Sequence, residues 1–365
     1  MPGSVYVAAT RQNDGKTTIS IGLLQAFSQI YDNVGFIKPV GQQSVLVGDE
    51  RIDKDTYLIS DICNIRDNLK MMSPIAVPKG FTEDYILNRN IKKDMLKNKL
   101  MTAYEHIKRG KDYVVIEGTG HAGVGSIFDF NNARVASLLG SRVIIVSKGG
   151  LGKPIDEIYM SKTLFEKEGV EVMGVIMNQV IEEKYEKIKQ LATKSLESMG
   201  LKLLGTIPQQ EILSAPTMAQ IREHLNAELI NGQYLYENIF QVVVGAMTAH
   251  HALNFMKKGT LLITPGDRED LILASLSAGI IGDNDEDCIS GIILTEGVMP
   301  HKNIFKLLQK TRIPVIIVNE GTYQTASKVH DLLVKITPQD KKKIELAKEL
   351  VSRYVDIDYI DRQSA

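Results

Sequence analysis

The chain has 365 residues, of which 44% are hydrophobic and 24% are charged, and its 43 Lys and Arg residues almost balance its 44 Asp and Glu residues. This composition is typical of a folded protein of two or three domains, and it excludes fibrous and disordered classes. The formal net charge of −1 offers no bulk attraction to nucleic acid or to an anionic membrane surface, so we expect neither as a partner.

The cysteines and the apolar segments indicate the compartment. Cys63 and Cys288 lie far apart and lack the paired spacing of a disulfide framework or a structural zinc site. The sequence starts with the strand-like segment SVYVAAT and shows no basic leader followed by a long apolar stretch. Its longest apolar stretch, residues 271–281, is too short to cross a membrane. We therefore expect a cytoplasmic protein.

In the first part of the chain, short β-branched segments alternate with longer helical patterns. Strands are predicted at residues 4–10, 33–40, 112–118, 142–147, 171–178 and 203–207. Helices are predicted between them at residues 16–30, 92–108, 133–139, 154–168 and 182–199. The strand segments are apolar throughout, as in sheets that helices cover on both faces. This order predicts an α/β fold with a doubly wound, mostly parallel sheet.

The pattern changes near Pro208, and residues 209–238 show no strong strand signal. A second series then predicts strands at residues 240–247, 260–264, 289–295 and 314–319. The helices of this series are predicted at residues 249–256, 269–279, 302–309 and 323–334. The acidic segment 282–287 is predicted as an exposed turn. The second series therefore predicts another, smaller α/β domain.

We accordingly divide the chain into a first domain at residues 1–210, a second at 211–335 and a C-terminal helical tail at 336–365. Within the tail, residues 339–355 have the pattern of a charged amphipathic helix. Residues 356–365 are predicted to fray, as chain ends commonly do.

The most informative motif joins the first predicted strand to the first predicted helix. Residues 10–18 read TRQNDGKTT, which matches the end of the phosphate-binding pattern GxxxxGK[ST], with Thr10 in place of the first glycine. Backbone N–H groups of such a loop and the positive end of the helix dipole hold anionic phosphates. Gly15 lets the backbone approach them, Lys16 can bridge the β- and γ-phosphates, and Thr18 can reach the α-phosphate. The motif therefore predicts an ATP site.

Mg²⁺ would accompany the nucleotide, and three side chains are candidate ligands. The Thr17 hydroxyl follows the loop lysine, as it does in phosphate-binding loops. Glu117 ends the apolar segment YVVIE, at the sheet edge where α/β proteins bind ligands; an ordinary strand-end glutamate in a turn is the alternative. Asp55 lies in the charged sequence DKD, for which a solvated loop is the alternative. We predict a magnesium site at Thr17, Asp55 and Glu117.

Three further residues lie at the same predicted edge or in the loop. Lys38 ends a strand and could place a cation beside a transferred phosphoryl group, and Asn178 ends another strand and could read an adenine edge. Arg11 could contact the γ-phosphate or point to solvent. Lys16 and Lys38 are the candidate catalytic residues. The predicted nucleotide-binding residues are Arg11, Asp14, Gly15, Lys16, Thr17, Thr18 and Asn178.

Over about the first 210 residues, the chain resembles the dethiobiotin-synthetase-like P-loop ATPases. The resemblance is carried by AATRQNDGKTT, GFIKPVGQ, DKD, VVIEGTG, MGVIMNQV and LGTIP. It implies that Lys16 is the phosphate lysine and that Lys38 lies near the γ-phosphate. It also implies Thr17, Asp55 and Glu117 as ligands of Mg²⁺, ATP and Mg²⁺ as cofactors, and a homodimer.

Some positions differ from dethiobiotin synthetases. Ala9 replaces a usual glycine, and Thr119 and Gly120 follow the acidic strand end where the family often has two glycines. After KPV, residues 41–43 read GQQ, which is similar to the N-terminal domain of long bacterial phosphotransacetylases. The resemblance therefore supports the nucleotide site more strongly than a synthetase substrate site.

Residues from about 212 to 330 resemble the DRTGG domain, which in long phosphotransacetylases lies between the ATPase-like and acetyltransferase domains. Its signature has the variant form PGDRED at residues 265–270, with VVGAMTAHHALNF before it and GIILTEG and IPVIIV after it. The resemblance implies a ligand-sensing or interaction module. Gly266, Asp267 and Arg268 form a possible ligand site, and a turn in which Asp267 caps the next helix is the alternative.

These features favour a nucleotide-binding regulatory protein that senses a small metabolite and acts on a partner enzyme. The alternative is an ATP-dependent synthetase or ligase that activates a carboxylate or carbamate by phosphoryl transfer. A partitioning-type ATPase, with Arg11 in place of a second loop lysine, is disfavoured by the KPV and DRTGG-like motifs. The two domains and the tail account for all 365 residues, so we expect the chain not to be an acetyltransferase by itself.

Overall fold

The computed structural model describes residues 2–281 and 289–364, and it divides into two compact units. The first unit combines residues Met1–Gln209 with Asp340–Ala365, and the second unit is Gln210–Gln339. The second unit is thus inserted in the sequence between two segments of the first. Each unit has its own sheet.

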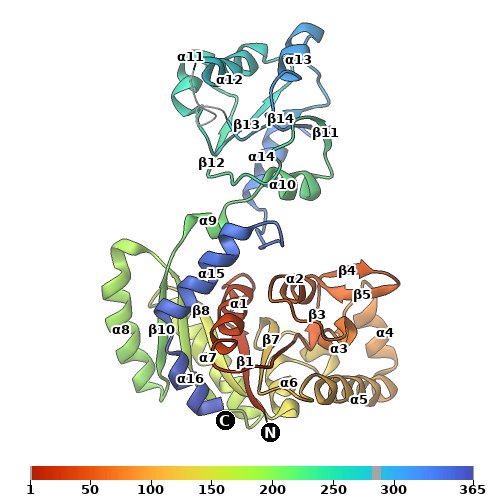
Figure 1. Ribbon diagram of the computed structural model, residues 1–365, viewed down its shortest axis with the longest axis vertical. Helices are drawn as coiled ribbons and strands as arrows, with labels where there is room; N and C mark the ends of the chain where they lie inside the picture. The colour runs from red at the N-terminus through yellow and green to blue at the C-terminus, as the bar shows by residue number, and fades with distance from the viewer. Residues whose placement is uncertain (1, 282–288, 365) are drawn as a thin grey trace. The chain divides into compact units, whose positions relative to one another are not determined.

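The first unit is built on a six-stranded sheet in the order β10-β9-β8-β1-β7-β2 (Figure 1). All five of its strand pairs are parallel. Its strands are β1 (Gly3–Ala9), β2 (Val34–Ile37), β7 (Tyr113–His121), β8 (Arg142–Lys148), β9 (Val172–Val180) and β10 (Leu203–Pro208). Every residue of β1 except Gly3 is buried, and successive side chains of a strand point to opposite faces, so both faces are covered. This confirms the predicted doubly wound, mostly parallel sheet.

The longer helices of this unit connect or cover the parallel strands. They are α1 (Lys16–Phe27), α5 (Arg89–Ile107), α6 (Asn132–Leu139), α7 (Lys153–Lys167) and α8 (Tyr185–Ser198). They follow the predicted helical patterns to within a few residues at each end. The chain therefore forms βαβ units whose carboxyl strand ends share one edge of the sheet.

Between β2 and α5, the structure contains short elements that the sequence analysis did not predict. They are β3 (Val40–Gly41), β4 (Ser44–Val47), β5 (Glu50–Asp53), α2 (Lys54–Ile62), α3 (Leu69–Met72), β6 (Ile75–Ala76) and α4 (Phe81–Leu87). β4 and β5 form an antiparallel hairpin, and β3 pairs with β6. The hairpin leads directly into α2, whose first turn carries Asp55. The charged sequence DKD, for which a solvated loop was the alternative, therefore lies at an ordered junction between a strand and a helix.

The C-terminal segment forms α15 (Lys341–Tyr354) and α16 (Ile357–Ser364) and packs on the first unit. The predicted fraying of residues 356–365 is wrong as far as residue 364, because α16 is ordered against β1 and its Ile360 is fully buried. α15 lies along α1, and Val351 fills the space beside Gly22. These contacts explain why most of α1 is buried, on more than the single apolar face that its sequence shows.

The second unit has a five-stranded sheet in the order β11-β15-β14-β13-β12, with β11 antiparallel to β15 and the other pairs parallel. The strands are β11 (Glu228–Asn231), β12 (Gln241–Val244), β13 (Thr260–Pro265), β14 (Gly291–Thr295) and β15 (Val315–Ile317). Its helices are α9 (Glu211–Ser214), α10 (Met218–Leu225), α11 (Ala249–Ala252), α12 (Glu269–Ile281), α13 (Lys302–Leu308) and α14 (Thr322–His330). β11 falls in a segment for which we predicted no strand. Two apolar clusters pack on the sheet, so this unit has a core of its own.

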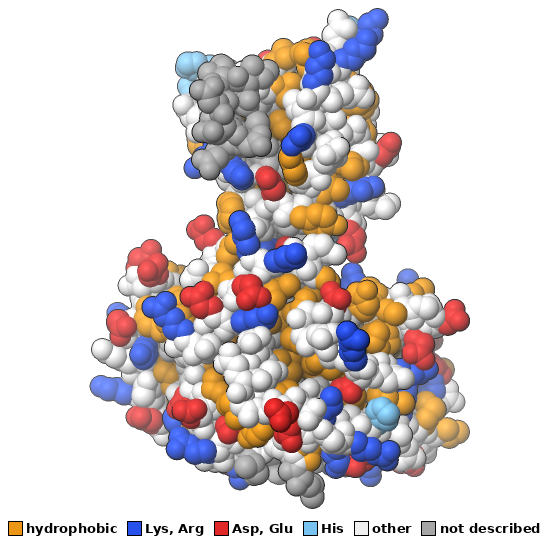
Figure 2. Space-filling view, in the orientation of Figure 1, with side chains coloured by type: hydrophobic (Ala, Val, Ile, Leu, Met, Phe, Trp, Pro, Cys, Tyr) orange, Lys and Arg blue, Asp and Glu red, His pale blue; other side chains and the backbone are white. Residues whose placement is uncertain are grey.

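One expectation about the surface cannot be compared with the structure, because the exposed turn predicted at residues 282–287 lies outside the described residues. No helix in the described part of the chain has the length and apolar character that a membrane crossing requires. Acidic and basic side chains are interspersed on the face of the first unit shown in Figure 2, as the balanced composition leads one to expect.

The contact between α1 and α15 gives a test of the fold. A Cβ atom at Gly22 would lie 2.3 Å from two carbon atoms of Val351, so Gly22→Ala should force the two helices apart. Overpacking of this kind costs about 1–3 kcal/mol, and we expect the free energy of unfolding to fall by that amount in urea denaturation. Gly321→Ala is the control, because a Cβ at Gly321 meets open space and its backbone, at φ −68° and ψ 159°, is one that alanine adopts. Equal stability of the two variants would contradict the close packing of α15 on α1.

Candidate functional site

The loop between β1 and α1 is shaped by a glycine and by residues at the end of β9. Gly15 has φ +97°, and a Cβ atom there would lie 2.1 Å from the Asn178 side-chain nitrogen, so only glycine fits. The Asn178 amide donates to the Asp14 carbonyl at 2.8 Å, and the Gln179 amide donates to the Asn13 carbonyl at 3.3 Å. β9 therefore holds the loop against the start of α1.

Asp14 closes the loop from within. Its carboxylate accepts from the Thr10 hydroxyl at 2.6 Å and from the Arg11 backbone N–H at 2.8 Å. Burial raises the pKa of Asp14, while the hydrogen bond from Thr10 opposes that shift. Thr10, which replaces the usual first glycine, is also 3.1 Å from the Ser147 hydroxyl at the end of β8. The substitution thus adds hydrogen bonds that fasten the loop.

Lys16 begins α1 and folds back over the loop. Its ammonium donates to the Gly120 carbonyl at 3.0 Å and to the Arg11 carbonyl at 3.3 Å. Burial lowers the pKa of Lys16 to about 8, partly offset by the nearby carboxylate of Glu117. Among the described residues this buried ammonium donates only to carbonyl groups, so it is well placed to take phosphate oxygens as stronger partners.

A buried ion cluster lies beside the loop, centred on Lys38. Its ammonium contacts Asp55, lies 3.0 Å from Glu117 Oε1 and lies 3.2 Å from Asp53 Oδ1. All four side chains are buried. Burial alone lowers the pKa of Lys38, but the carboxylates of Asp55, Glu117 and Asp53 outweigh it and hold the pKa well above its usual value. Lys38 is therefore a fixed cation at the carboxyl edge of the sheet.

The loop and the cluster meet at Glu117, in the middle of β7, which continues to His121 beyond the strand end that the sequence predicted. Its Oε1 accepts from Lys38 and, at 3.2 Å, from the Thr17 hydroxyl on α1. Its Oε2 is buried and has no hydrogen-bond partner among the described residues. A buried carboxylate oxygen without a partner is costly, so this atom marks a position where a cation would be favourable.

The donor set fits Mg²⁺ as the companion of a nucleotide. Among the described residues, no three His, Cys, Asp or Glu side chains form a ready metal cage. Mg²⁺ usually binds one or two carboxylates and takes its remaining ligands from phosphates and water. Thr17, Asp55 and Glu117 can provide such a partial set, and three carboxylates face the single ammonium of Lys38.

Not every predicted nucleotide-binding side chain points to a free ligand position. The Arg11 Nε atom lies 2.6–2.8 Å from both carboxylate oxygens of Glu157 on α7. The Asn178 amide nitrogen is engaged by the loop backbone, as described above. Thr18 is half-buried in the first turn of α1. The structure thus brings Lys16, Thr17, Lys38, Asp55 and Glu117 together, and gives Arg11 and Asn178 partners within the protein.

Sequence reasoning missed two residues of this site. Asp53 caps α2 by accepting from the Asp55 backbone N–H at 2.9 Å, and it also binds Lys38. The sequence DKD contained this signal, since an acid before a helix start is a common cap. The sequence contained no signal that Glu157 contacts the loop, because only the tertiary fold brings α7 beside Arg11.

In the second unit, the predicted motif follows β13. Gly266 is packed so closely that a Cβ atom would lie 1.9 Å from the Val298 carbonyl. The Arg268 guanidinium donates to the Gly245 carbonyl at 2.6 Å and to the Met247 carbonyl at 2.9 Å, and it pairs with Asp270. The side chain of Asp267 is exposed. The arginine therefore fastens the segment after β12, and its donors are used inside the unit.

Comparison with known proteins identifies both units. Residues 3–217 match the family described as AAA domain, and residues 220–332 match the DRTGG domain. The chain is 27% identical over 375 residues to a phosphate acetyltransferase of Nitratidesulfovibrio vulgaris and 28% identical over 375 residues to one of Pseudomonas putida. Each alignment covers 98% of this chain and 51% of the relative, so the chain spans about half the length of these relatives.

The solved structures matched by part of the chain include a putative plasmid partition protein of Borrelia burgdorferi bound to AMPPNP. It is 16% identical, with a TM-score of 0.40, and the alignment covers 58% of this chain and 89% of that chain. The family matches and the parallel sheet with its phosphate-type loop agree with the resemblance seen in the sequence. The chain therefore belongs to the AAA domain family through its first unit, and its second unit contains a DRTGG domain.

Proposed function

We propose that the first unit binds ATP with Mg²⁺ at the loop of residues 10–18. The observation that carries this proposal is the junction at Glu117, whose Oε1 accepts from Thr17 while its buried Oε2 lacks a partner among the described residues. The loop offers backbone N–H groups and Lys16 for phosphates, and Glu117 offers an anion for the metal. Glu117, which would bind the metal, thus lies beside the loop and Lys16, which would bind the phosphates, as a complex of Mg²⁺ with ATP requires.

We further propose that the chain works as a nucleotide-dependent regulatory protein, with the DRTGG domain as its sensing or interaction module. In support, its relatives are phosphate acetyltransferases and the chain corresponds to about half of their length. Magnesium binding, a homodimer and a partner enzyme belong to this proposal. A small metabolite would be the signal of the second domain.

An ATP-dependent ligase is the second candidate, and the position of Lys38 favours it. Its buried ammonium lies beside the loop, where a cation could stabilise a phosphoryl group in transfer. Lys16 and Lys38 would be the catalytic residues in that case. Rapid ATP turnover that requires one small carboxylate or amine would favour the ligase over the regulator.

Lys16 tests the nucleotide site. Lys16→Ala removes the ammonium that would bind phosphate oxygens, and hydrogen bonds to charged groups are worth about 1.5–3 kcal/mol. We expect ATP affinity, measured by isothermal titration calorimetry, to fall by at least about tenfold. Lys187→Ala, at an exposed position of α8 away from the loop, is a control for the loss of a lysine. Unchanged ATP affinity in Lys16→Ala would show that the loop does not hold phosphates.

Glu117 tests the metal site separately. Glu117→Gln keeps the size of the side chain and its bond to Thr17 but removes the charge. We expect Mg²⁺ to enhance ATP binding to the natural chain and to have much less effect on the variant, because a neutral amide is a weaker ligand for Mg²⁺. Titrations of ATP with Mg²⁺ and with EDTA measure this difference. An equal Mg²⁺ effect in both proteins would exclude Glu117 as a ligand.

Asp53 has two roles in the structure that two variants can separate. Asn is as good a helix cap as Asp, so Asp53→Asn should keep the cap of α2 and lose only the charge beside Lys38. Asp53→Ala loses both and should be less stable than Asp53→Asn by about 1 kcal/mol in urea denaturation. Equal stability of the two variants would mean that the cap does not stabilise α2.

A further inference from the structure

The ammonium of Lys38 occupies the same carboxylates that are proposed above to bind Mg²⁺. It contacts Asp55 and lies 3.0 Å from Glu117 Oε1. A lysine ammonium has three N–H donors, and a third carboxylate, that of Asp53, lies 3.2 Å away. Each donor of Lys38 therefore has a carboxylate within reach, and the ammonium competes with any other cation for the same oxygen atoms.

These ion pairs are shielded from water. The side chains of Lys38, Asp53, Asp55 and Glu117 are between 1% and 9% exposed. Opposite charges attract more strongly where water is excluded, so buried pairs do not exchange freely with dissolved cations. Three carboxylates nevertheless face one ammonium, and the Glu117 Oε2 atom has no hydrogen-bond partner among the described residues. The cluster therefore has an excess of negative charge that a divalent cation would balance.

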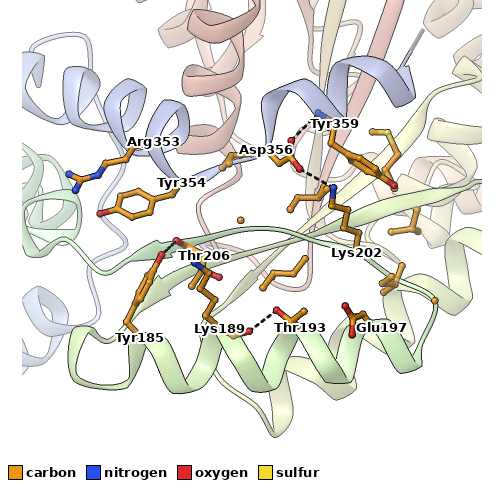
Figure 3. Close-up of a pocket in the computed structure, with 18 of the residues that line it drawn as sticks. Tyr185, Lys189, Thr193, Glu197, Lys202, Thr206, Arg353, Tyr354, Asp356 and Tyr359 are labelled. Carbon is orange, nitrogen blue, oxygen red and sulfur yellow. Dashed lines mark hydrogen bonds and ion pairs between the residues drawn. The ribbon is translucent and has the colours of Figure 1, made fainter.

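The ion pair of Lys202 with Asp356 provides a contrast. It lies in a cavity of about 830 Å³ between α8, β10 and residues 353–359, and the Lys202 ammonium is 2.9 Å from the carboxylate (Figure 3). The two side chains are 41% and 40% exposed. Exposed pairs contribute little, because water and salt screen their charges. Lys202 thus pairs with a screened carboxylate, whereas Lys38 is held by three buried ones.

Lys38 lies close enough to the loop to exchange carboxylates for phosphates. The Glu117 Oε1 atom accepts from Lys38 and, at 3.2 Å, from the hydroxyl of Thr17, which follows Lys16 in the chain. Burial is the main cause of the lowered pKa of Lys16, and the positive charge of Lys38 contributes to it. The ammonium of a lysine is carried on a flexible aliphatic stem. Phosphate oxygens held by Lys16 are therefore an alternative partner for Lys38.

We propose that the Lys38 ammonium is a built-in substitute for the metal ion beside the loop. Lys38 neutralises Asp55 and Glu117 before a nucleotide binds, and it moves to the phosphate oxygens when a nucleotide binds, which frees both carboxylates for Mg²⁺. Binding of a divalent cation thus depends on the nucleotide. This inference rests on the ATP site proposed above, and it explains how that site takes up its metal only together with the phosphates.

The first test uses Mn²⁺ as the probe and contains no nucleotide. Free Mn²⁺ is measured by electron paramagnetic resonance while the full chain is titrated. Lys38→Met removes the ammonium and keeps the length of the side chain, so we expect it to bind Mn²⁺ at least about tenfold more tightly than the natural chain does. Lys202→Met is the matched control, because it removes a lysine from the exposed carboxylate of Asp356 and should give no gain.

A double variant covers the loss of stability that is expected when buried carboxylates lose their counter-ion. Lys38→Met with Asp53→Asn removes one positive and one negative charge, so the net charge of the cluster does not change, and asparagine keeps the cap of α2. We expect this variant also to gain Mn²⁺ affinity, because no ammonium competes for Asp55 and Glu117. Glu117→Gln added to it should abolish the gain, since it removes one of the two remaining carboxylates.

A second measurement tests the movement of Lys38 to the phosphates. In EDTA, we expect the double variant to bind ATP about tenfold more weakly than the natural chain in calorimetry, because a charged partner of the phosphates is lost. Equal ATP affinity of the two proteins would contradict this movement.

Three results of the Mn²⁺ titrations would overturn the proposal: no gain in either Lys38 variant, a gain that survives Glu117→Gln, or an equal gain in Lys202→Met. The proposed ATP site fails on a different result, which is the absence of ATP binding to the natural chain. If the natural chain binds ATP and neither Lys38 variant gains Mn²⁺ affinity, only the role of Lys38 is refuted.

Discussion

The buried ammonium of Lys38 among the carboxylates of Asp53, Asp55 and Glu117 is the constraint on which the first unit depends. Charges removed from water must be paired, and here the partners come from different elements. Lys38 follows β2, the two aspartates lie where β5 meets α2, and Glu117 belongs to β7. The pairing thus joins the sheet edge to the segment of short elements between β2 and α5.

The same cluster connects structure to the proposed chemistry. Glu117 is shared between Lys38 and the Thr17 hydroxyl, so the metal position and the phosphate loop are adjacent. The loop itself is fastened by Asp14, Asn178 and Thr10 through bonds inside the protein. Such preorganisation lets the loop bind an anion without first paying to order its backbone. The side chain of Arg11 takes no part in this arrangement, because Glu157 holds it.

The regular α/β elements of both units could be predicted from the sequence, since buried parallel strands have continuous apolar segments and their helices have clear patterns. The hairpin β4–β5, the helix α2 and the strand β11 could not, because each of these strands has only four residues and α2 begins in a charged sequence. The sequence also did not predict that α16 is an ordered helix. Residues 357–364 are ordered because they pack on β1, where Ile360 is buried. In the sequence, the Arg268 guanidinium was part of a possible ligand site. In the structure it donates to two backbone carbonyls of the segment after β12, which only the fold brings close to it.

The sequence by itself determined the parallel sheet, the phosphate-type loop and the candidate acid at Glu117, because each depends on residues that are neighbours in the chain. The tertiary structure alone decided that Asp53 belongs to the cluster of Lys38, that α15 and α16 complete the first unit, and that a cavity forms between α8 and residues 353–359. These features join segments that lie from 15 residues apart, as for Lys38 and Asp53, to more than 300 residues apart, as for Gly22 and Val351. Contacts between residues so far apart leave no pattern in the local sequence, because they form only when the whole chain has folded.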